Sequence, residues 1–180
     1  MKILALDCAT RLGWASKHEL AGREGLDWGH EDFPIPRGSS AGMRWINFLA
    51  WLERMIDQVK PELIVFEQPF IGAMRSGTAA EIAYGMSTRV QQVAEARGID
   101  YRPVSAAVLK KWATGKGNAG KPEMIAAANQ KLQLGFADEP TISDDNEADA
   151  ALILLWAMAG MPEPEPARKK PARKKKAVAA

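Results

Sequence analysis

The sequence predicts an α/β fold in which a mixed five-stranded sheet carries helices on both faces. Three strand-like segments open the chain within residues 2–33, separated by short connections that are typical of antiparallel neighbours. Helix-like and strand-like segments alternate after that, which is typical of α/β units with parallel strands. The last helix-like segment, residues 143–159, is apolar nearly all round, so we expect it to be buried against the sheet.

The first half of the chain supplies the antiparallel strands and an amphipathic helix. Residues 2–10 form a short apolar run that stops at polar residues, and two further strand-like segments follow it. Two prolines, a glycine and two serines then interrupt the sheet. Apolar residues recur at helical spacing after them until Pro61. The expected elements are strands over 2–10, 11–19 and 25–33 and a helix over 40–59.

The second half supplies the parallel part of the sheet. Residues 62–69 (ELIVFEQP) contain an apolar run that turns polar, which is typical of a central parallel strand and places Glu67 at its C-terminal end. A second helical pattern covers 79–97, and Gly98 is expected to end it. The other expected elements are a loop over 70–78, a strand over 99–105, helices over 105–113, 122–134 and 143–159, and a glycine-rich loop over 115–120.

Charge is distributed unevenly between the body of the chain and its end. The net charge is +2, but residues 161–180 hold seven basic and two acidic residues, which leaves 17 basic and 20 acidic residues in the body. This pattern predicts one folded domain over 1–160 and a disordered basic tail, rich in proline and lysine, over 161–180. Such a tail suits a polyanion, most simply nucleic acid, and a tail that only increases solubility is the alternative.

Several classes of protein are disfavoured by composition. No apolar run reaches the roughly 18–20 residues that a membrane span needs. The opening MKILALDCAT has only a short apolar stretch and meets Asp7, so it is interpreted as a strand and not as a signal peptide. The single cysteine, Cys8, excludes an internal disulfide and fits a reducing cytosol. We therefore expect a cytoplasmic protein without membrane association.

Acidic residues stand where predicted buried elements begin or end. Asp7 interrupts the first strand, Glu67 ends the central strand, and Asp145 and Asp149 share one face at the start of the last helix. Clustered carboxylates repel each other and stay ionised only if cations compensate, and Mg²⁺ or Mn²⁺ is the natural partner of oxygen-rich sites. Two such ions can activate a water and stabilise the leaving oxygen of a phosphodiester. Taken singly, these residues could instead be a strand-end turn former, a surface charge and helix caps.

These segments resemble the RuvC family of Holliday junction resolvases, in the RNase H-like superfamily, over nearly the whole body of the chain. LALDCATRLGWA is similar to the family's first-strand motif, which implies that Asp7 is a metal ligand. VFEQPF resembles the segment with the second acidic ligand, which is matched by Glu67. NEADAALILLWA is similar to the final helix, whose last ligand is matched by Asp149. The resemblance implies an RNase H-like fold with a five-stranded mixed sheet.

The resemblance also implies contacts with DNA. Phe70, three residues after Glu67, matches an aromatic residue that wedges into the junction. VLKKWATGKGNAGK is similar to the family's basic segment, in which Lys110 and Lys121 match two lysines near the scissile phosphate. Lys121 is also expected to act in catalysis, and Arg75 is expected to contact DNA. The alternatives are an aromatic ring folded onto the core and lysines on solvated helix surfaces.

One position departs from the family's pattern. The family places an Asp or His three residues before the last ligand, and this sequence has Asn146 there. Asparagine can bind a hard cation through its carbonyl oxygen but carries no charge. Asp145, one residue earlier, is therefore expected to act as the fourth metal ligand and catalytic carboxylate, and Asn146 remains the alternative.

The expected function is metal-dependent cleavage of branched DNA. The resemblance implies a crossover junction endodeoxyribonuclease that uses two Mg²⁺ or Mn²⁺ ions per site and works in DNA recombination and repair. A four-way junction has two-fold symmetry, so paired nicks imply a homodimer. Two alternatives remain: a less selective RNase H-like debranching or flap nuclease, and a non-catalytic protein that binds branched DNA.

Overall fold

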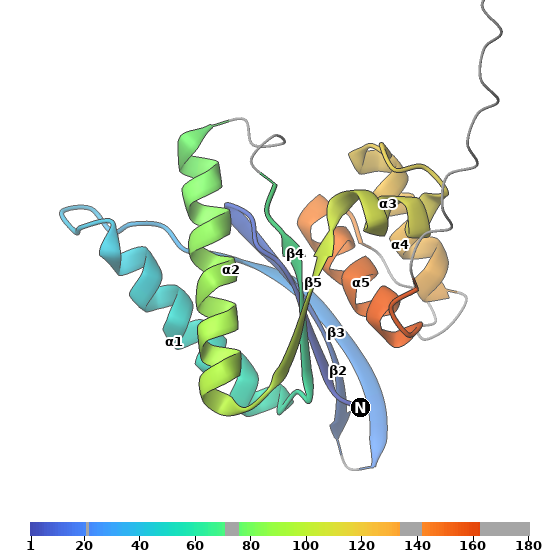
Figure 1. Ribbon diagram of the computed structural model, residues 1–180, viewed down its shortest axis with the longest axis horizontal. Coiled ribbons are helices and arrows are strands. Elements are labelled where there is room, and N and C mark those ends of the chain that lie inside the picture. The colour runs from blue at the N-terminus through green and yellow to red at the C-terminus, as the bar shows by residue number, and fades with distance from the viewer. Residues whose placement is uncertain (21, 71–75, 134–141, 163–180) are drawn as a thin grey trace, which may run out of the picture.

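The sheet and its helices form three layers (Figure 1). In this computed structural model the described residues are 1–20, 22–70, 76–133 and 142–162. Within them, five strands form one sheet in the order β3-β2-β1-β4-β5. The predicted mixed sheet with helices on both faces is therefore confirmed. The strands are β1 (Ile3–Asp7), β2 (Arg11–Leu20), β3 (Arg23–Asp32), β4 (Leu63–Gln68) and β5 (Asp100–Ser105).

Strand pairing divides the sheet into an antiparallel and a parallel half. β1 pairs antiparallel with β2, and β2 pairs antiparallel with β3. On its other edge β1 pairs parallel with β4, which pairs parallel with β5. The predicted opening meander and the predicted parallel strand before Glu67 are both present. The first strand is shorter than expected, because it ends at Asp7.

The helices begin and end close to the predicted positions. α2 (Gly77–Arg97) starts before the expected residue 79, because Ser76 caps it by accepting a hydrogen bond from the backbone N–H of Ala79 at 3.1 Å. Gly98 ends α2 in the left-handed conformation, as predicted. The helices in the described ranges are α1 (Gly42–Val59), α2 (Gly77–Arg97), α3 (Ala106–Thr114), α4 (Lys121–Gln133) and α5 (Asp145–Met158).

Alternation along β1 separates two hydrophobic layers. Leu4 and Leu6 face α1 and α2, whereas Ile3 and Ala5 face α5. β4 follows the same alternation, so its odd-numbered residues also lie on the α5 side. Side chains at 3, 5 and 7 of β1 therefore share one face of the sheet with those at 63, 65 and 67 of β4.

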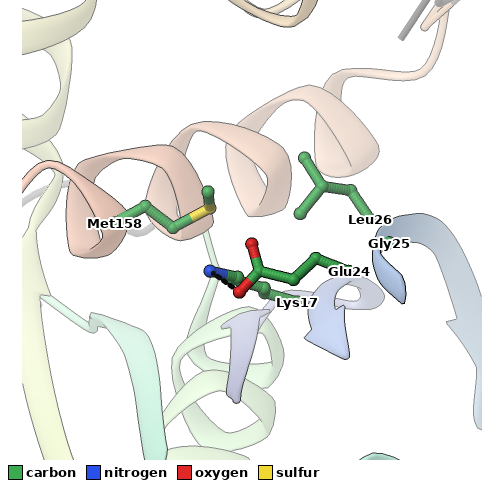
Figure 2. A pocket seen from close by; sticks show the side chains of 5 residues that line it. All are labelled: Lys17, Glu24, Gly25, Leu26 and Met158. Atoms are coloured by element: carbon green, nitrogen blue, oxygen red, sulfur yellow. Dashed lines mark ion pairs between the residues drawn. The ribbon is translucent and has the colours of Figure 1, made fainter. Parts of the chain in front are cut away.

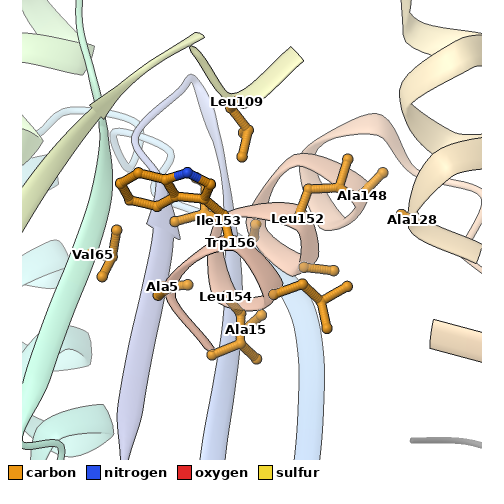
Figure 3. Close-up of a cluster of buried hydrophobic side chains, with 14 of the residues drawn as sticks. Ala5, Ala15, Val65, Leu109, Ala128, Ala148, Leu152, Ile153, Leu154 and Trp156 are labelled. Atoms are coloured by element: carbon orange, nitrogen blue, oxygen red, sulfur yellow. The ribbon is translucent and has the colours of Figure 1, made fainter. Parts of the chain in front are cut away.

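The helix α5 is buried against the sheet along most of its length (Figure 3). Every residue from Ala150 to Ala157 is buried, which confirms the sequence prediction for an apolar helix. Ala5 and Ala15 are register partners on β1 and β2, and both pack in the same core cluster as α5. Their small side chains leave room for the helix to approach the strands closely.

The described chain continues two residues into the predicted tail. Met161 packs against the core, and the indole N–H of Trp156 donates a hydrogen bond to the carbonyl oxygen of Pro162 at 3.1 Å. The rest of the expected tail, 163–180, lies outside the described residues. No helix within the described ranges is both long and apolar enough to cross a membrane.

Candidate functional site

Strand register brings Asp7 and Glu67 to the same level of the sheet. Ile3 pairs with Leu63, and the parallel register runs on to Leu6 opposite Phe66. Asp7 and Glu67 each follow directly, on neighbouring strands and on the face covered by α5. Adjacent strands lie about 4.7–4.9 Å apart, so register alone makes these two carboxyl groups neighbours.

The first turns of α5 lie over the same end of the sheet because β2 has a glycine there. Gly13 is the register partner of Asp7. A Cβ atom at Gly13 would lie 2.0 Å from the carbonyl oxygen of Asn146, so only glycine allows the helix backbone to approach this strand so closely. Asp145 and Asp149, one helical turn apart, are thereby brought to the strand ends that carry Asp7 and Glu67.

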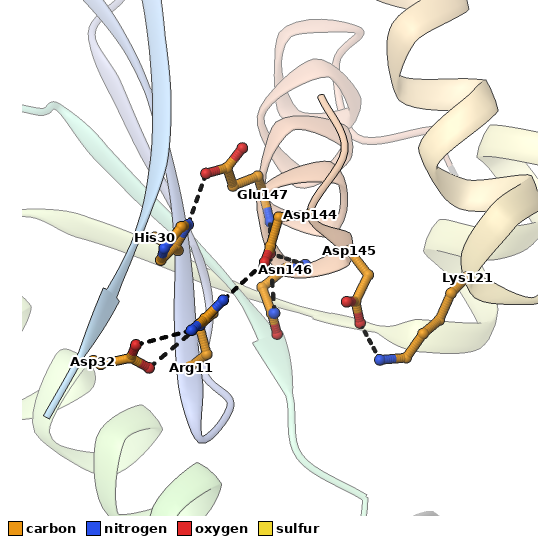
Figure 4. Close-up of polar contacts among 8 residues, drawn as sticks. All are labelled: Arg11, His30, Asp32, Lys121, Asp144, Asp145, Asn146 and Glu147. Carbon is orange, nitrogen blue, oxygen red and sulfur yellow. Dashed lines mark hydrogen bonds and ion pairs between the residues drawn. The ribbon is translucent and has the colours of Figure 1, made fainter. Parts of the chain in front are cut away.

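Hydrogen bonds and ion pairs hold the start of α5 (Figure 4). Asp144 is its N-cap, and the Asp144 carboxylate accepts hydrogen bonds from the backbone N–H groups of Asn146 at 2.9 Å and Glu147 at 3.3 Å. Asp145 forms an ion pair with Lys121 at the start of α4. Asp144 is thus the residue that caps α5, whereas Asp145 pairs with Lys121.

These residues line one cleft of about 480 Å³. Asp7, Glu67 and Asp149 lie in its wall with Asp145, Asn146 and Lys121, so strands β1 and β4 and helices α4 and α5 all contribute. The remaining lining residues are small or polar: Cys8, Ala9, Thr10, Ala79 and Ala83. The acidic residues singled out from the sequence are thus brought together by the fold.

Burial and mutual repulsion raise the pKa values of the carboxyl groups in the cleft. Asp7 is only 8% exposed, and burial, followed by the charges of Glu67 and Asp149, raises its pKa well above the ordinary 3.8. Burial and the charge of Asp149 raise the pKa of Glu67 to about 7. Burial also raises the pKa of Asp149 to about 6, although Lys110 and Lys121 oppose the shift. The three carboxyl groups therefore keep their protons to a higher pH than isolated ones, and a bound cation would favour their ionised forms.

The chemistry of the cleft fits a hard divalent cation. The side-chain donors of Asp7, Glu67, Asp149, Asp145 and Asn146 include carboxylate or amide oxygens, which Mg²⁺ and Mn²⁺ prefer. The Oδ1 atom of Asp149 is buried and has no hydrogen-bond partner in the described part of the chain, which is costly for a polar atom. In those same ranges, however, no three His, Cys, Asp or Glu side chains already form a set that could hold an ion. The donor type and charge fit a cation, and the side chains need adjustment to surround one.

Two of the predicted DNA-contacting residues lie beside the cleft. Lys110 on α3 is close enough for its charge to lower the pKa values of Glu67 and Asp149. Lys121 lines the cleft itself. Lys121 is also 75% exposed at the first residue of α4, so it is at once a surface lysine of the first helical turn and a residue of the cleft wall.

Phe70 projects from the end of β4 and is 71% exposed. It does not fold back onto the core, the alternative weighed from the sequence. The hydroxyl of Tyr84 on α2 donates a hydrogen bond to the carbonyl oxygen of Pro69 at 3.1 Å, which ties the backbone just before Phe70 to the helix. Arg75, the other predicted contact, lies outside the described residues.

Cys8 is adjacent to the site but is not built as a nucleophile. It is buried, and burial, followed by the charges of Asp7 and Glu67, raises its pKa well above the ordinary value. A protonated thiol is a weak nucleophile. Cys8 therefore acts as a small buried residue beside Asp7.

A second hollow lies at the other end of α5, beside the β2–β3 turn (Figure 2). It is lined by Lys17, Glu24, Gly25, Leu26 and Met158. Lys17 and Glu24 form an ion pair at 2.8 Å, so its charges are matched within the hollow. It lacks the unbalanced carboxylates that distinguish the cleft at Asp7.

Three residues that shape the site carry no signal in the local sequence. Arg11 forms ion pairs with Asp144 and Asp32, His30 contacts Glu147, and Gly13 lies under Asn146. Each joins the β2–β3 hairpin to the start of α5, across more than a hundred positions of sequence. A local pattern gives no signal for such contacts, because they depend on which helix covers which strands.

The fold is similar to those of solved Holliday junction resolvases, although no family model matches the sequence. The structure of RuvC from Thermus thermophilus has a TM-score of 0.66 and 20% identity, over 91% of this chain and 99% of that one. T. thermophilus RuvC in complex with a Holliday junction substrate has a TM-score of 0.67 and 22% identity, over the same shares. The fowlpox virus resolvase in complex with Holliday junction DNA has a TM-score of 0.58 and 15% identity, over 89% and 99%. At such identities the similarity shows the fold, and the RNase H-like fold expected from the sequence is confirmed.

Proposed function

We propose that this protein is a metal-dependent endonuclease that resolves four-way DNA junctions by hydrolysing phosphodiester bonds. The observation that carries the proposal is the meeting of Asp7, Glu67 and Asp149, from β1, β4 and α5, in one cleft with raised pKa values. Similarity of fold to resolvases that were solved with Holliday junction DNA supports the choice of substrate.

Asp7, Glu67 and Asp149 are the proposed metal ligands. Asp145 is the proposed fourth ligand and Asn146 the alternative, since both line the cleft. When bound, Mg²⁺ or Mn²⁺ ions, two per site, would supply a nucleophilic water at neutral pH and neutralise charge on the phosphate. Asp145 is paired with Lys121, so its role as a ligand requires that this ion pair open.

Lys121 and Lys110 are proposed to stabilise the negative charge that develops on the phosphate. Both lie close enough to the carboxylates to influence the pKa of Asp149, so a phosphate held at the carboxylates would also lie near both ammonium groups. Positive groups fixed near the reacting phosphate lower the barrier most when they need no rearrangement. Lys121 would exchange Asp145 for the phosphate as its partner.

Recognition of the junction is proposed to involve Phe70, Arg75 and the basic tail. The exposed ring of Phe70 is placed to stack against an unpaired base at the branch point. Arg75 and the seven basic residues of the proposed tail, 161–180, following a domain over 1–160, would add phosphate contacts that carry no sequence information. The protein would act as a homodimer in the cytoplasm, each subunit cutting one strand.

The proposal is tested by incubating the protein with a synthetic four-way junction and Mg²⁺ or Mn²⁺. We expect symmetric nicks on opposing strands, at least about 10³-fold slower for Asp7→Asn, which removes a ligand charge without changing side-chain size. Glu62→Gln, which lies directly before the strand that carries Glu67 and is exposed, is the matched control and should cleave normally.

Other outcomes separate the alternatives. Equal cleavage of junctions, flaps, RNA–DNA hybrids and plain duplexes would favour a less selective RNase H-like nuclease. Tight junction binding without cleavage in either metal would favour a non-catalytic binding protein. Cleavage that survives Asp7→Asn would contradict the proposed site.

A further inference from the structure

We propose that Arg11 is a positioning residue that fixes the first turn of α5 against the β2–β3 hairpin and so sets Asp145, Asn146 and Asp149 opposite Asp7. Arg11 does not line the cleft. The inference deepens the proposed function and rests on it for its catalytic consequence.

The guanidinium of Arg11 bridges two carboxylates from different elements (Figure 4). Its Nε and Nη2 atoms donate to Asp32, at the end of β3, at 3.4 and 3.2 Å. Its Nη1 atom donates to Asp144, the N-cap of α5, at 3.2 Å. Arg11 and Asp32 are also register partners in the sheet, so the strand pair presents the guanidinium in a fixed place. The planar group suits this double contact in a way that lysine does not.

Asp144 transmits this constraint to the cleft. Its Oδ2 atom accepts from Arg11, while its Oδ1 atom accepts from the backbone N–H of Asn146 and from the Asn146 side-chain amide at 3.1 Å. Because the amide nitrogen of Asn146 is turned to Asp144, the Asn146 side chain is held in one orientation at the cleft wall. A shift of Asp144 would therefore move the first helical turn and its cleft-lining side chains together.

Two further contacts between the β2–β3 hairpin and α5 also hold the first turn of the helix in place. His30 Nδ1 lies 2.7 Å from Glu147 Oε1, which ties β3 to the next residue of the turn. Gly13, the register partner of both Asp7 and His30, lies directly under the backbone of Asn146. Close packing prevents the helix from moving toward the sheet, and the polar contacts oppose its moving away. Unlike Gly13, Arg11 can be changed without creating a clash.

The test compares Arg11→Met with Arg97→Met. Arg97 also bridges two carboxylates, Glu53 and Asp57, and it is 42% exposed where Arg11 is 46% exposed. It joins α2 to α1 across the other face of the sheet, so Arg97→Met loses a similar exposed ion-pair network far from α5. Hydrogen exchange of the full chain, measured without DNA, reports on the amides of residues 146–148, and Mn²⁺ titration reports on the cleft.

For Arg11→Met we expect protection of the 146–148 amides to fall about two- to five-fold, the range for loss of an exposed ion pair. The Mn²⁺ dissociation constant should rise by a similar factor. Junction cleavage should slow about ten-fold or more in kcat, with junction affinity in EDTA unchanged. Arg97→Met should leave the amide protection, the Mn²⁺ dissociation constant and kcat at wild-type values. Arg11→Lys should give values between those of Arg11→Met and wild type.

A double-mutant cycle identifies Asp144 as the partner. Asp144→Asn keeps an equally good helix cap but removes the charge that Arg11 contacts, so it should reproduce the Arg11→Met effect and add nothing to it. Wild-type protection of 146–148 in Arg11→Met, or an equal loss in Arg97→Met, would overturn the proposal. If the wild type neither binds Mn²⁺ nor cleaves junctions, the proposed function fails, while the exchange data still decide whether Arg11 fixes the turn.

Discussion

At the scale of single residues, the ionised carboxyl groups of the cleft lower the stability of the folded chain when no cation is bound. Glu67 has a pKa of about 7 in the folded chain against an ordinary 4.5, and Asp149 is shifted from 3.8 to about 6. Below about pH 3 these groups are protonated in both the folded and the unfolded chain, so they do not lower the stability. As the pH rises from there through 6 and 7, the unfolded chain releases protons first, so folding stability falls. Charge compensation by a divalent cation should therefore stabilise the protein most above pH 7.

Replacement of Glu67 by glutamine should make the metal-free protein more stable. In EDTA at pH 8, we expect Glu67→Gln to raise the free energy of unfolding by about 1–3 kcal/mol, because a buried charge beside Asp149 is removed. At pH 4 the gain should vanish. Urea unfolding at pH 8 and at pH 4 measures the difference in free energy of unfolding between the variant and the wild type. Glu62→Gln is the control, since contact with Lys2 lowers the pKa of Glu62 and its loss should not stabilise. No gain at pH 8 for Glu67→Gln would contradict the electrostatic account.

Sequence patterns locate some site residues and miss others for a physical reason. Asp7 and Glu67 could be predicted because each is a charge at the end of a buried strand, a conflict visible in a few neighbouring residues. Asp149 stands out in the same way in an apolar helix. Arg11 and Gly13 look ordinary in β2, because their importance comes from Asp144 and Asn146, which only the folded chain brings near.

At the scale of elements, the position of α5 decides whether a site exists. The strands fix Asp7 and Glu67 through register, but Asp149 reaches them only if the helix lies close to β2. The sequence predicted that α5 is buried, from its apolar surface, but not which strands it crosses. The helix crosses the strands where the residues at 5, 13 and 15 are small. Alanine or glycine in a strand does not by itself predict such a crossing, because small residues occur in strands for other reasons too.

A methyl group at Gly13 should therefore damage the site through α5. In Gly13→Ala the added Cβ would meet the Asn146 carbonyl, so the helix must move by an ångström or more. We expect the free energy of unfolding to fall by about 1–3 kcal/mol. The cleavage rate should fall by a factor on the order of 10². Thermal unfolding and junction cleavage measure the two effects. Gly77→Ala, where a Cβ has open space, is the matched control, and wild-type cleavage by Gly13→Ala would show that close packing of α5 is not required.

At the scale of the whole molecule, the described part of each chain brings Asp7, Glu67 and Asp149 together in one cleft, while a four-way junction presents two equivalent strands. The three-layer fold could be predicted from the alternation of elements, because helices must cover both faces of a parallel sheet. The pairing of two subunits leaves no comparable signal, since it depends on complementary surfaces that no periodic pattern marks. The proposed homodimer therefore follows from substrate symmetry.

Mixing wild-type and Asp7→Asn subunits tests that symmetry. If two subunits each cut one strand, mixed dimers should nick a single strand of a junction, and linear product from a supercoiled cruciform plasmid should fall with the square of the wild-type fraction. Light scattering should give twice the chain mass. A fall in direct proportion to the wild-type fraction, with a monomer mass, would contradict paired action.

The most direct measurement of the central claim is anomalous diffraction from crystals soaked in Mn²⁺. We expect Mn²⁺ peaks within coordination distance of carboxylate oxygens of Asp7, Glu67 and Asp149, including the Oδ1 atom of Asp149 that otherwise has no partner among the described residues. The same peaks should be absent from crystals of Asp7→Asn. Mn²⁺ bound only elsewhere on the surface, with no ion coordinated by the three carboxyl groups, would contradict the proposed metal site.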